Sequence, residues 1–322
     1  MTRLSYHVSH EQFAPGTLLK WVQRAEDAGF DAAFSSDHLQ PWSADQGQSG
    51  FAWSWLGAAL QATQRLTFGI ITVPGEWRYH PVVLAQAVAT LGEMFPNRVP
   101  WIALGSGEAI NERITGREWP DKLERNERLR EGAEIIRALL RGETVTHRGR
   151  VTAINAKIWS RPETPARLMG AATSEATARW LGSWADGLLT AGSRPESIRS
   201  VIDAFREGGG QGKPIHVKVD LSYARTEALA LANAHSQWRF NTLGGDINWE
   251  LTSPDDFHRA ARFVRPEDMR ESVFIGSEPA RFVHWLRELD SLGVESIDLH
   301  NVGQNQEEFI DVFGSDVLPQ LR

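Results

Sequence analysis

The chain has 322 residues, 41% hydrophobic and 23% charged, which is the composition of an ordinary globular protein and excludes wholesale disorder. Its formal net charge of −7 lacks the basic excess that nucleic-acid binding requires, so no nucleic-acid partner is expected. Cysteine is absent, which excludes disulfides and thiolate chemistry, and no stretch approaches ~20 apolar residues, so we expect no membrane span and a cytoplasmic location.

Short apolar or β-branched runs recur along the chain, with periodic helix-like segments between them. The candidate strands are 4–8, 31–35, 66–71, 99–104, 167–171, 187–190, 215–221 and 296–300. The candidate helices are 15–29, 53–63, 81–95, 124–141, 174–184, 195–206 and 279–292. Eight such units in alternation favour an α/β fold, a closed (β/α)8 TIM barrel, over a doubly wound sheet.

Two segments are too long to be simple connections between a strand and a helix. Residues 142–165 resemble a short β excursion, and residues 222–278 contain further helices and a Gly244-Gly245 break. We expect both to be insertions at the C-terminal face of the barrel. No repeat or linker divides the chain, so residues 1–322 are expected to form a single domain.

The second strand is followed by an acid, an imidazole and an indole, which are Asp37, His38 and Trp42. Active sites of (β/α)8 barrels lie at the carboxyl ends of the strands. An imidazole there could take the proton from a substrate hydroxyl while hydride leaves the same carbon. In the alternative interpretation, His38 is a structural histidine and Trp42 anchors the loop.

The fourth strand ends in a glycine-rich bend that contains Ser106, Gly107, Glu108 and Asn111. Glycines let the backbone approach a planar ring or a phosphate, and a buried Glu108 could act as a general acid. The third glycine of the dinucleotide-binding fingerprint is missing, so a plain glycine turn is the alternative.

Later strand ends supply helix openings and basic side chains. A phosphate could bind the amino-terminal amides of the helix opened by Ala172, Thr173 and Ser174, although these residues also fit plain N-caps. An anionic substrate could be met by Arg194, Arg259 and Arg281, unless these lie on solvated faces. The ten histidines are scattered without metal-ligand spacing, so no metal site is expected.

Three motifs in this order resemble the bacterial luciferase-like flavin oxidoreductases: residues 36–42, 77–81 and 105–112. The resemblance runs from Tyr6 to Leu321 and is strongest to the glucose-6-phosphate dehydrogenases that use the deazaflavin coenzyme F420 and to a neighbouring subgroup presumed to use FMN. It implies a TIM barrel, usually a homodimer, with a flavin or deazaflavin across the carboxyl ends of the strands.

By motif match, the resemblance implies that Asp37 contacts the cofactor, His38 is the base, Trp42 lies near the reacting carbon and Glu108 is the acid. The remaining cofactor contacts would come from Ile71, Thr72, Ser106, Gly107, Asn111, Ala172, Thr173 and Ser174. The family also implies a non-proline cis peptide at the end of the third strand, between Ile71 and Thr72.

The chain departs from the family in the sugar-phosphate pocket. Thr190 matches the family, whereas Ser193, with Arg194 beside it, and Arg259 stand where the dehydrogenases have lysines. The third basic position of the family has no secure counterpart here, and Arg281 is the candidate for it. Arginine and lysine differ in geometry and hydration, so this departure puts glucose 6-phosphate as the substrate in doubt.

These observations predict an oxidoreductase that transfers a hydride between coenzyme F420 or FMN and a small alcohol or sugar-like substrate. The alternative is a monooxygenase that uses reduced FMN and dioxygen, as luciferase does. A flavin-binding sensory barrel without turnover is a third interpretation, disfavoured because both His38 and Glu108 are present.

Overall fold

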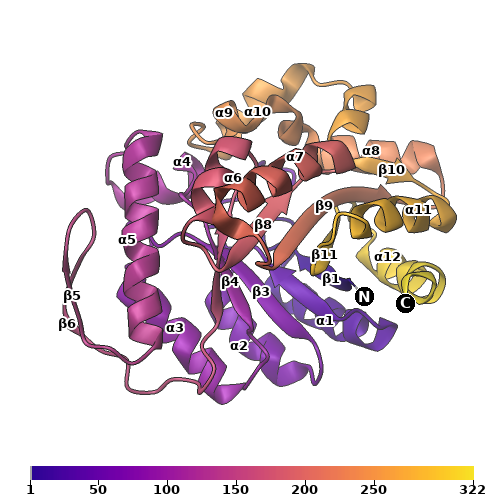
Figure 1. Cartoon of the computed structure of the whole chain (residues 1–322). Coiled ribbons are helices and arrows are strands. Elements are labelled where there is room, and N and C mark those ends of the chain that lie inside the picture. The colour runs from indigo at the N-terminus through magenta and orange to yellow at the C-terminus, as the bar shows by residue number, and fades with distance from the viewer. Residues whose placement is uncertain (1) are drawn as a thin grey trace.

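Eight parallel strands alternate with helices along the chain and close into a barrel (Figure 1). The computed structural model describes residues 2–322, except for the side chain of Asp246. The barrel strands are β1 (Arg3–Val8), β2 (Ala32–Ser35), β3 (Thr67–Thr72), β4 (Trp101–Leu104), β7 (Arg167–Ala171), β8 (Gly187–Ala191), β9 (Ile215–Tyr223) and β11 (Ser296–Asn301). The helices that follow them in turn are α1 (Pro15–Ala28), α2 (Ala52–Ala62), α3 (Pro81–Met94), α5 (Lys122–Leu140), α6 (Glu175–Gly182), α7 (Pro195–Phe205), α11 (Pro279–Asp290) and α12 (Gln306–Val312). The predicted (β/α)8 TIM barrel is confirmed.

The barrel closes because the sheet pairs with itself at both ends. From β9 the order runs through β11, β1, β2, β3, β4 and β7 to β8, and β8 then pairs back onto β9 with Leu188 opposite Ile215. All of these pairings are parallel. The carboxyl ends of all eight strands therefore surround one opening.

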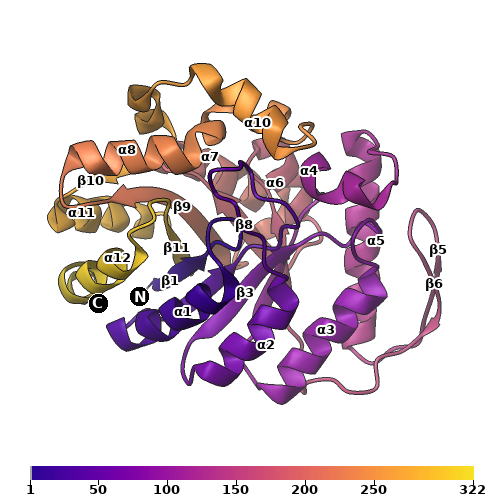
Figure 2. The same cartoon turned by 180° about the vertical axis from the view of Figure 1, so that it is seen from behind.

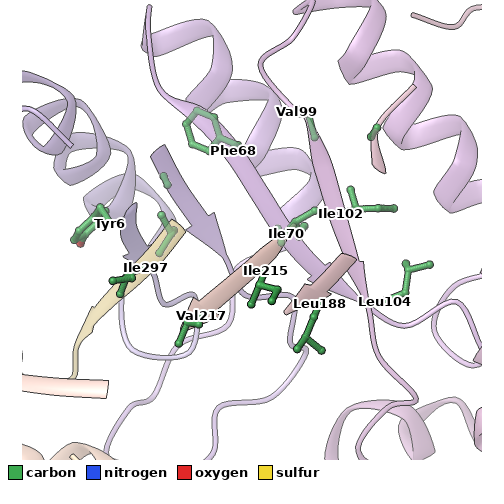
Figure 3. Packing of buried hydrophobic residues seen from close by; sticks show 14 of the residues in the cluster. Tyr6, Phe68, Ile70, Val99, Ile102, Leu104, Leu188, Ile215, Val217 and Ile297 are labelled. Carbon is green, nitrogen blue, oxygen red and sulfur yellow. The ribbon is translucent and has the colours of Figure 1, made fainter. Parts of the chain in front are cut away.

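Alternation along the strands creates an outer core and a filled lumen. The outer core packs between strands and helices, and Figure 3 shows Phe68 and Ile70 of β3 beside Ile102 and Leu104 of β4 in this layer. A separate apolar cluster fills part of the lumen, with residues Phe34, Trp101, Ala103, Met169 and Leu189.

The β9 side of the lumen is charged rather than apolar. Val217 and Val219 join the outer core, so Lys218 and Asp220, which alternate with them, face the lumen. Strand β11 alternates in the same way and adds an aspartate and a histidine, Asp298 and His300, which are both buried.

The segment 142–165 forms an antiparallel hairpin of β5 (Val145–Arg148) and β6 (Thr152–Ala156) alongside α5 (Figure 1). Glu131 of α5 holds it, because its carboxylate lies 3.0 Å from His147 Nε2 and accepts from the Val151 amide at 2.9 Å. The predicted β excursion is confirmed, but its expected place at the C-terminal face is wrong. The segment joins the end of α5 to the start of β7, and helices run antiparallel to the strands, so it leaves from the opposite face.

The insertion 222–278 lies at the carboxyl ends of the strands, as predicted, and covers one side of the opening (Figure 2). It contains α8 (Glu227–Trp238), α9 (Gly245–Asn248), α10 (Pro254–Ala260) and a short strand β10 (Phe274–Gly276) that pairs with β9 outside the barrel. Its own apolar cluster includes Trp238, Phe240 and Phe257.

Shorter turns complete the chain. The helix α4 (Ala109–Glu112) follows β4, and the 3-10 and π turns are η1 (Arg113–Thr115), η2 (Arg206–Gly210), η3 (Arg239–Leu243), η4 (Ala261–Phe263), η5 (Pro266–Glu271), η6 (Phe313–Val317) and η7 (Leu318–Leu321). None of the helices within residues 2–322 has both the length and the apolarity that a bilayer crossing demands.

The peptide bond between Ile71 and Thr72 is trans, so the expected cis bond is wrong; the described chain contains no cis peptide. The reason lies in the strand ladder. Thr72 still pairs with Leu104 of β4, so β3 stays regular to its last residue instead of bulging.

The crossing of α6 with the turn after α7 supplies a stability test. A Cβ at Gly208 would lie 1.9 Å from the Arg179 carbonyl oxygen, so we expect Gly208→Ala to lower the free energy of unfolding by about 1–3 kcal/mol. Gly16→Ala in α1 is the control, because its Cβ would meet nothing within 4 Å. Urea unfolding of both variants measures this, and equal midpoints would contradict the close crossing.

Candidate active site

A cavity of about 540 Å³ opens at the carboxyl ends of the barrel strands. Its walls come from strand ends around the barrel and from the insertion after β9. They include the predicted catalytic residues His38, Trp42 and Glu108, the predicted cofactor-binding residues Asp37, Ile71, Thr72, Ser106, Gly107, Asn111, Ala172, Thr173 and Ser174, and the predicted substrate residue Thr190. Thr190 is buried, and its hydroxyl has no hydrogen-bond partner in the described part of the chain.

Three predicted substrate residues lie outside this cavity. Arg194 is the N-cap of α7, and Arg259 forms an exposed ion pair with Asp256 in α10. Arg281 pairs with Glu227 at 3.1 Å across α11 and α8. The structure therefore does not bring these arginines together with His38.

His38 lies between two carboxylates. Its Nδ1 is 3.0 Å from Glu11 Oε1, and its Nε2 is 3.6 Å from Glu108 Oε2. The Nδ1 contact is a close charge contact without hydrogen-bond alignment. An anion at Nδ1 favours the tautomer that carries its proton there, which leaves Nε2 free to accept a proton on the Glu108 side.

The two carboxylates have opposite electrostatic environments. Burial opposes ionisation of Glu11, but His38, its own backbone amide and the Ser36 hydroxyl outweigh burial and lower its pKa to about 2. Burial raises the pKa of Glu108, and His38 offsets this only in part. Glu11 is therefore a fixed anion, and Glu108 is the carboxyl better suited to carry a proton.

Asp37 is held by side chains from the strand end after β3. It accepts from Thr72 Oγ1 at 2.8 Å and from the Tyr79 hydroxyl at 2.9 Å, and Arg78 Nη1 approaches it at 3.4 Å. Arg78 also contacts Glu112 at 3.3 Å. This buried cluster fixes the loop that carries His38 against β3 and β4.

The bend after β4 shapes the opposite wall. Asn111 accepts from the Leu39 amide at 2.9 Å and donates to Glu108 at 3.1 Å, so it connects the two loops beside His38. Gly107 has a φ of 92°, and a Cβ there would lie 2.9 Å from the Trp119 ring. Only glycine combines this backbone with such a close approach.

Aromatic rings join His38 to the insertion after β9. The Trp42 ring meets the His38 ring edge-on at 5.0 Å and stacks on Phe240 at 5.6 Å. Phe240 lies 5.0 Å from Trp238. One side of the cavity is thus a continuous aromatic wall.

The floor of the cavity is a buried polar network. Asp220 accepts from His300 Nδ1 at 2.9 Å and forms an ion pair with Lys218. His7 Nδ1 lies 2.6 Å from Asp298. Burial raises the pKa of Asp298 well above its usual range and lowers that of His7 to about 3, so this second pair favours its neutral form.

Sequence reasoning missed several residues that line the cavity, notably Glu11, Lys218 and Asp220. Glu11 follows the first strand by three residues, so the strand-end rule applied there would have found it. In the seventh predicted strand, Lys218 and Asp220 alternate with Val217 and Val219. Charged residues at every second position of a strand indicate a polar face, and this pattern could have identified both residues. No group of histidines, aspartates and glutamates in residues 2–322 is arranged to hold a metal ion.

The fold is a (β/α)8 barrel with a cavity at the carboxyl ends of its strands, and comparison with known proteins identifies its class as a luciferase-like oxidoreductase. The model of the luciferase-like monooxygenase family matches residues 1–296, and the chain belongs to this family. The chain is also 34% identical to an F420-dependent glucose-6-phosphate dehydrogenase of Microbacterium testaceum, over 99% of this chain and 97% of the relative. The predicted family membership is confirmed.

Solved structures give the same result for the fold. An F420-dependent secondary alcohol dehydrogenase in complex with an F420-acetone adduct matches with a TM-score of 0.93 and 28% identity, covering 100% of this chain and 99% of that one. The coenzyme F420-dependent tetrahydromethanopterin reductase from Methanopyrus kandleri matches with a TM-score of 0.79 and 21% identity, over 100% of this chain and 99% of that one. This second likeness concerns the fold alone.

The buried charge of Glu11 makes stability depend on pH. Folded Glu11 stays ionised down to about pH 2, whereas in the unfolded chain it protonates near its ordinary pKa of 4.5. Its contribution is therefore complete above pH 4.5 and is lost as the pH falls toward 2. We expect Glu11→Gln to lower the free energy of unfolding at pH 7 by up to about 3 kcal/mol.

The measurement is urea unfolding of wild type and Glu11→Gln at several pH values between 7 and 3. The difference between the two proteins should shrink as the pH falls. Glu93→Gln, at an exposed position in α3, is the control and should behave as wild type does. A difference that is constant with pH would contradict the assignment of a buried anion.

Proposed function

We propose that the protein is an F420-dependent dehydrogenase that transfers a hydride from a small alcohol to the cofactor. The observation that carries the proposal is the meeting of His38, Trp42 and Glu108 in one cavity with the glycine-lined wall after β4. Similarity at 28% identity to an F420-dependent secondary alcohol dehydrogenase supports it, as do curated relatives named F420-dependent glucose-6-phosphate dehydrogenase.

The wall formed by β3, β4 and β7 fits a flat ring system. Gly107 leaves space where a Cβ would collide with Trp119, and Ile71 contributes apolar surface beside it. Hydrogen bonds and backbone amides on this side would come from Thr72, Ser106, Asn111, Ala172, Thr173 and Ser174. Lys122, which is exposed at the start of α5, would meet the anionic side chain of F420.

When bound, F420 supplies a ring carbon that accepts a hydride. His38 Nε2 takes the proton of the substrate hydroxyl while the carbinol carbon loses its hydride, so the alcohol becomes a carbonyl compound. Glu11 is a positioning residue, because its carboxylate lies 3.0 Å from His38 Nδ1 and favours the tautomer with the proton on that nitrogen. Trp42 excludes water on the substrate side, because its ring packs between His38 and Phe240.

Glu108 has a separate role on the other side of His38. Its raised pKa suits a group that stays protonated at a pH where other carboxyls have ionised. It therefore supplies or holds a proton beside the ring, and Asn111 orients it through a 3.1 Å hydrogen bond. In this proposal Glu11 is the fixed anion and Glu108 is the proton donor.

The proposal is tested by titrating the protein separately with F420 and with FMN, following ring fluorescence, and by assaying F420 reduction with secondary alcohols under argon. We expect tight binding of F420 and reduction without dioxygen. His38→Gln should bind F420 as wild type does but lose at least about 100-fold in kcat, because it lacks the base. Full activity of His38→Gln would exclude this role.

Tight binding of FMN alone, with dioxygen consumed in the presence of substrate, would replace the proposal with a monooxygenase. The control variant is His284→Gln, at an exposed histidine of α11 that lies outside the cavity. It should change neither cofactor binding nor turnover.

Alanine substitutions at two glycines distinguish the effect of backbone strain from the effect of a steric clash at the proposed cofactor wall. Gly107 and Gly116 both have positive φ, 92° and 79°, but a Cβ at Gly116 would meet nothing within 4 Å. We expect Gly107→Ala to weaken F420 binding at least about tenfold, because Trp119 and the bend must shift by several tenths of an ångström. Gly116→Ala should bind F420 as wild type does, and equal loss in both variants would contradict this wall as the site.

A further inference from the structure

Lys218 and Asp220 form an ion pair on the side of the cavity that faces away from the proposed cofactor wall. Both side chains come from β9, and both line the cavity. The Lys218 ammonium also lies 4.9 Å from the centre of the Trp238 ring. Trp238 leads through Phe240 and Trp42 to His38, so the pair and the proposed base share one wall.

The pair carries two charges but no net charge. Burial opposes ionisation of Asp220, but Lys218 and a hydrogen bond from His300 hold the pKa of its carboxyl well below the usual range. The positive charge of Lys218 is thus already balanced by the carboxylate of Asp220. An anionic substrate group placed beside it would also meet the Asp220 carboxylate, and this repulsion offsets the attraction to lysine.

The other cations that line the cavity are engaged or lie elsewhere. Arg78 contacts Asp37 and Glu112, and Arg125 pairs with Glu250 at 3.0 Å. Lys122 belongs to the β4 side, where we place the cofactor. The arginines that sequence reasoning assigned to a phosphate lie outside the cavity, so the substrate side offers no surplus positive charge.

The hydrogen-bonding groups of the pair suit a hydroxyl. Lys218 donates to Asp220 and has no other hydrogen-bond partner within residues 2–322, so further N–H donors remain available. Asp220 accepts, and Asn241, which also lines the cavity, approaches it at 3.5 Å. A hydroxyl both donates and accepts, whereas a phosphate dianion only accepts.

We propose that the substrate is an uncharged alcohol with a second hydroxyl, a diol or polyol, and that the Lys218–Asp220 pair binds this second hydroxyl. The proposal rests on the proposed dehydrogenase function and adds the substrate class. The aromatic rings that run from the pair to His38 would pack against the carbon chain of such a substrate. A cavity shared with a cofactor ring restricts the substrate to a small molecule.

The experiment compares matched substrates in the F420-reduction assay: propan-2-ol with propane-1,2-diol, and glycerol with glycerol 3-phosphate. For wild type we expect kcat/KM to be about tenfold to a hundredfold higher for the diol than for propan-2-ol, as for a hydrogen bond to a charged group. The kcat/KM for glycerol should also be higher than that for glycerol 3-phosphate. Binding of the diol in the absence of F420, followed by tryptophan fluorescence, is a second readout that needs no turnover.

Lys218→Met should bring the diol preference close to one and weaken diol binding to a similar degree. Lys157→Met is the matched control: this lysine also lies over a tryptophan, Trp159, but on the exposed hairpin side. It should retain the wild-type preference and activity. The wild-type comparisons require no variant, so they test the proposed substrate class even if Lys218→Met does not fold.

The outcomes separate the two proposals. Turnover of propan-2-ol without a preference for the diol would overturn the substrate class and leave the dehydrogenase function in place. A preference for glycerol 3-phosphate would overturn it in favour of an anionic substrate. If no alcohol reduces F420 although F420 binds, the dehydrogenase function is wrong and the substrate class falls with it.

Discussion

Pairing of β8 with β9 is the interaction on which the rest of the molecule depends. Leu188 lies opposite Ile215 and Ala191 opposite Lys218, and this short parallel ladder joins the two ends of the sheet. In an open sheet β8 and β9 would lie at opposite ends of the strand order. Closure brings the strand ends of β4, β7 and β8 around to face the insertion after β9, so that they line one cavity together with the histidine loop after β2.

Closure also creates a lumen that the sequence must fill, and the chain fills it in two ways. One side contains apolar rings and aliphatic chains such as Phe34 and Met169. The other contains ionisable groups from β1, β9 and β11, in which His7 is paired with Asp298 and both Lys218 and His300 are paired with Asp220. Buried charges cost desolvation free energy, and mutual pairing offsets that cost while fixing the geometry. The cavity therefore has a rigid polar floor beneath a largely apolar and aromatic wall.

The periodicity of the strands carried enough information to predict the barrel, because alternation and chain order are local properties. Strand-end residues such as His38 and Glu108 were predictable for the same reason: a closed barrel brings every strand end to one opening. The position of Arg259 was not predictable, since it depends on how an irregular insertion folds back. The hairpin was placed at the wrong face because the direction of the helix before it was not considered. Glu11 was missed because only the ends of later strands were considered.

The long insertion is tied to the loop after β2 by polar contacts that span most of the chain. Arg239 pairs with Asp45 at 2.9 Å, and Gln46 donates to the Gln237 carbonyl at 3.2 Å. These partners are 194 and 191 residues apart in the sequence. Contacts of such separation are slow to form, because the intervening chain must first be ordered. During synthesis the wall around His38 therefore assembles only after β9 and the insertion have emerged, and a nascent chain that ends earlier has the His38 loop without the insertion that covers it.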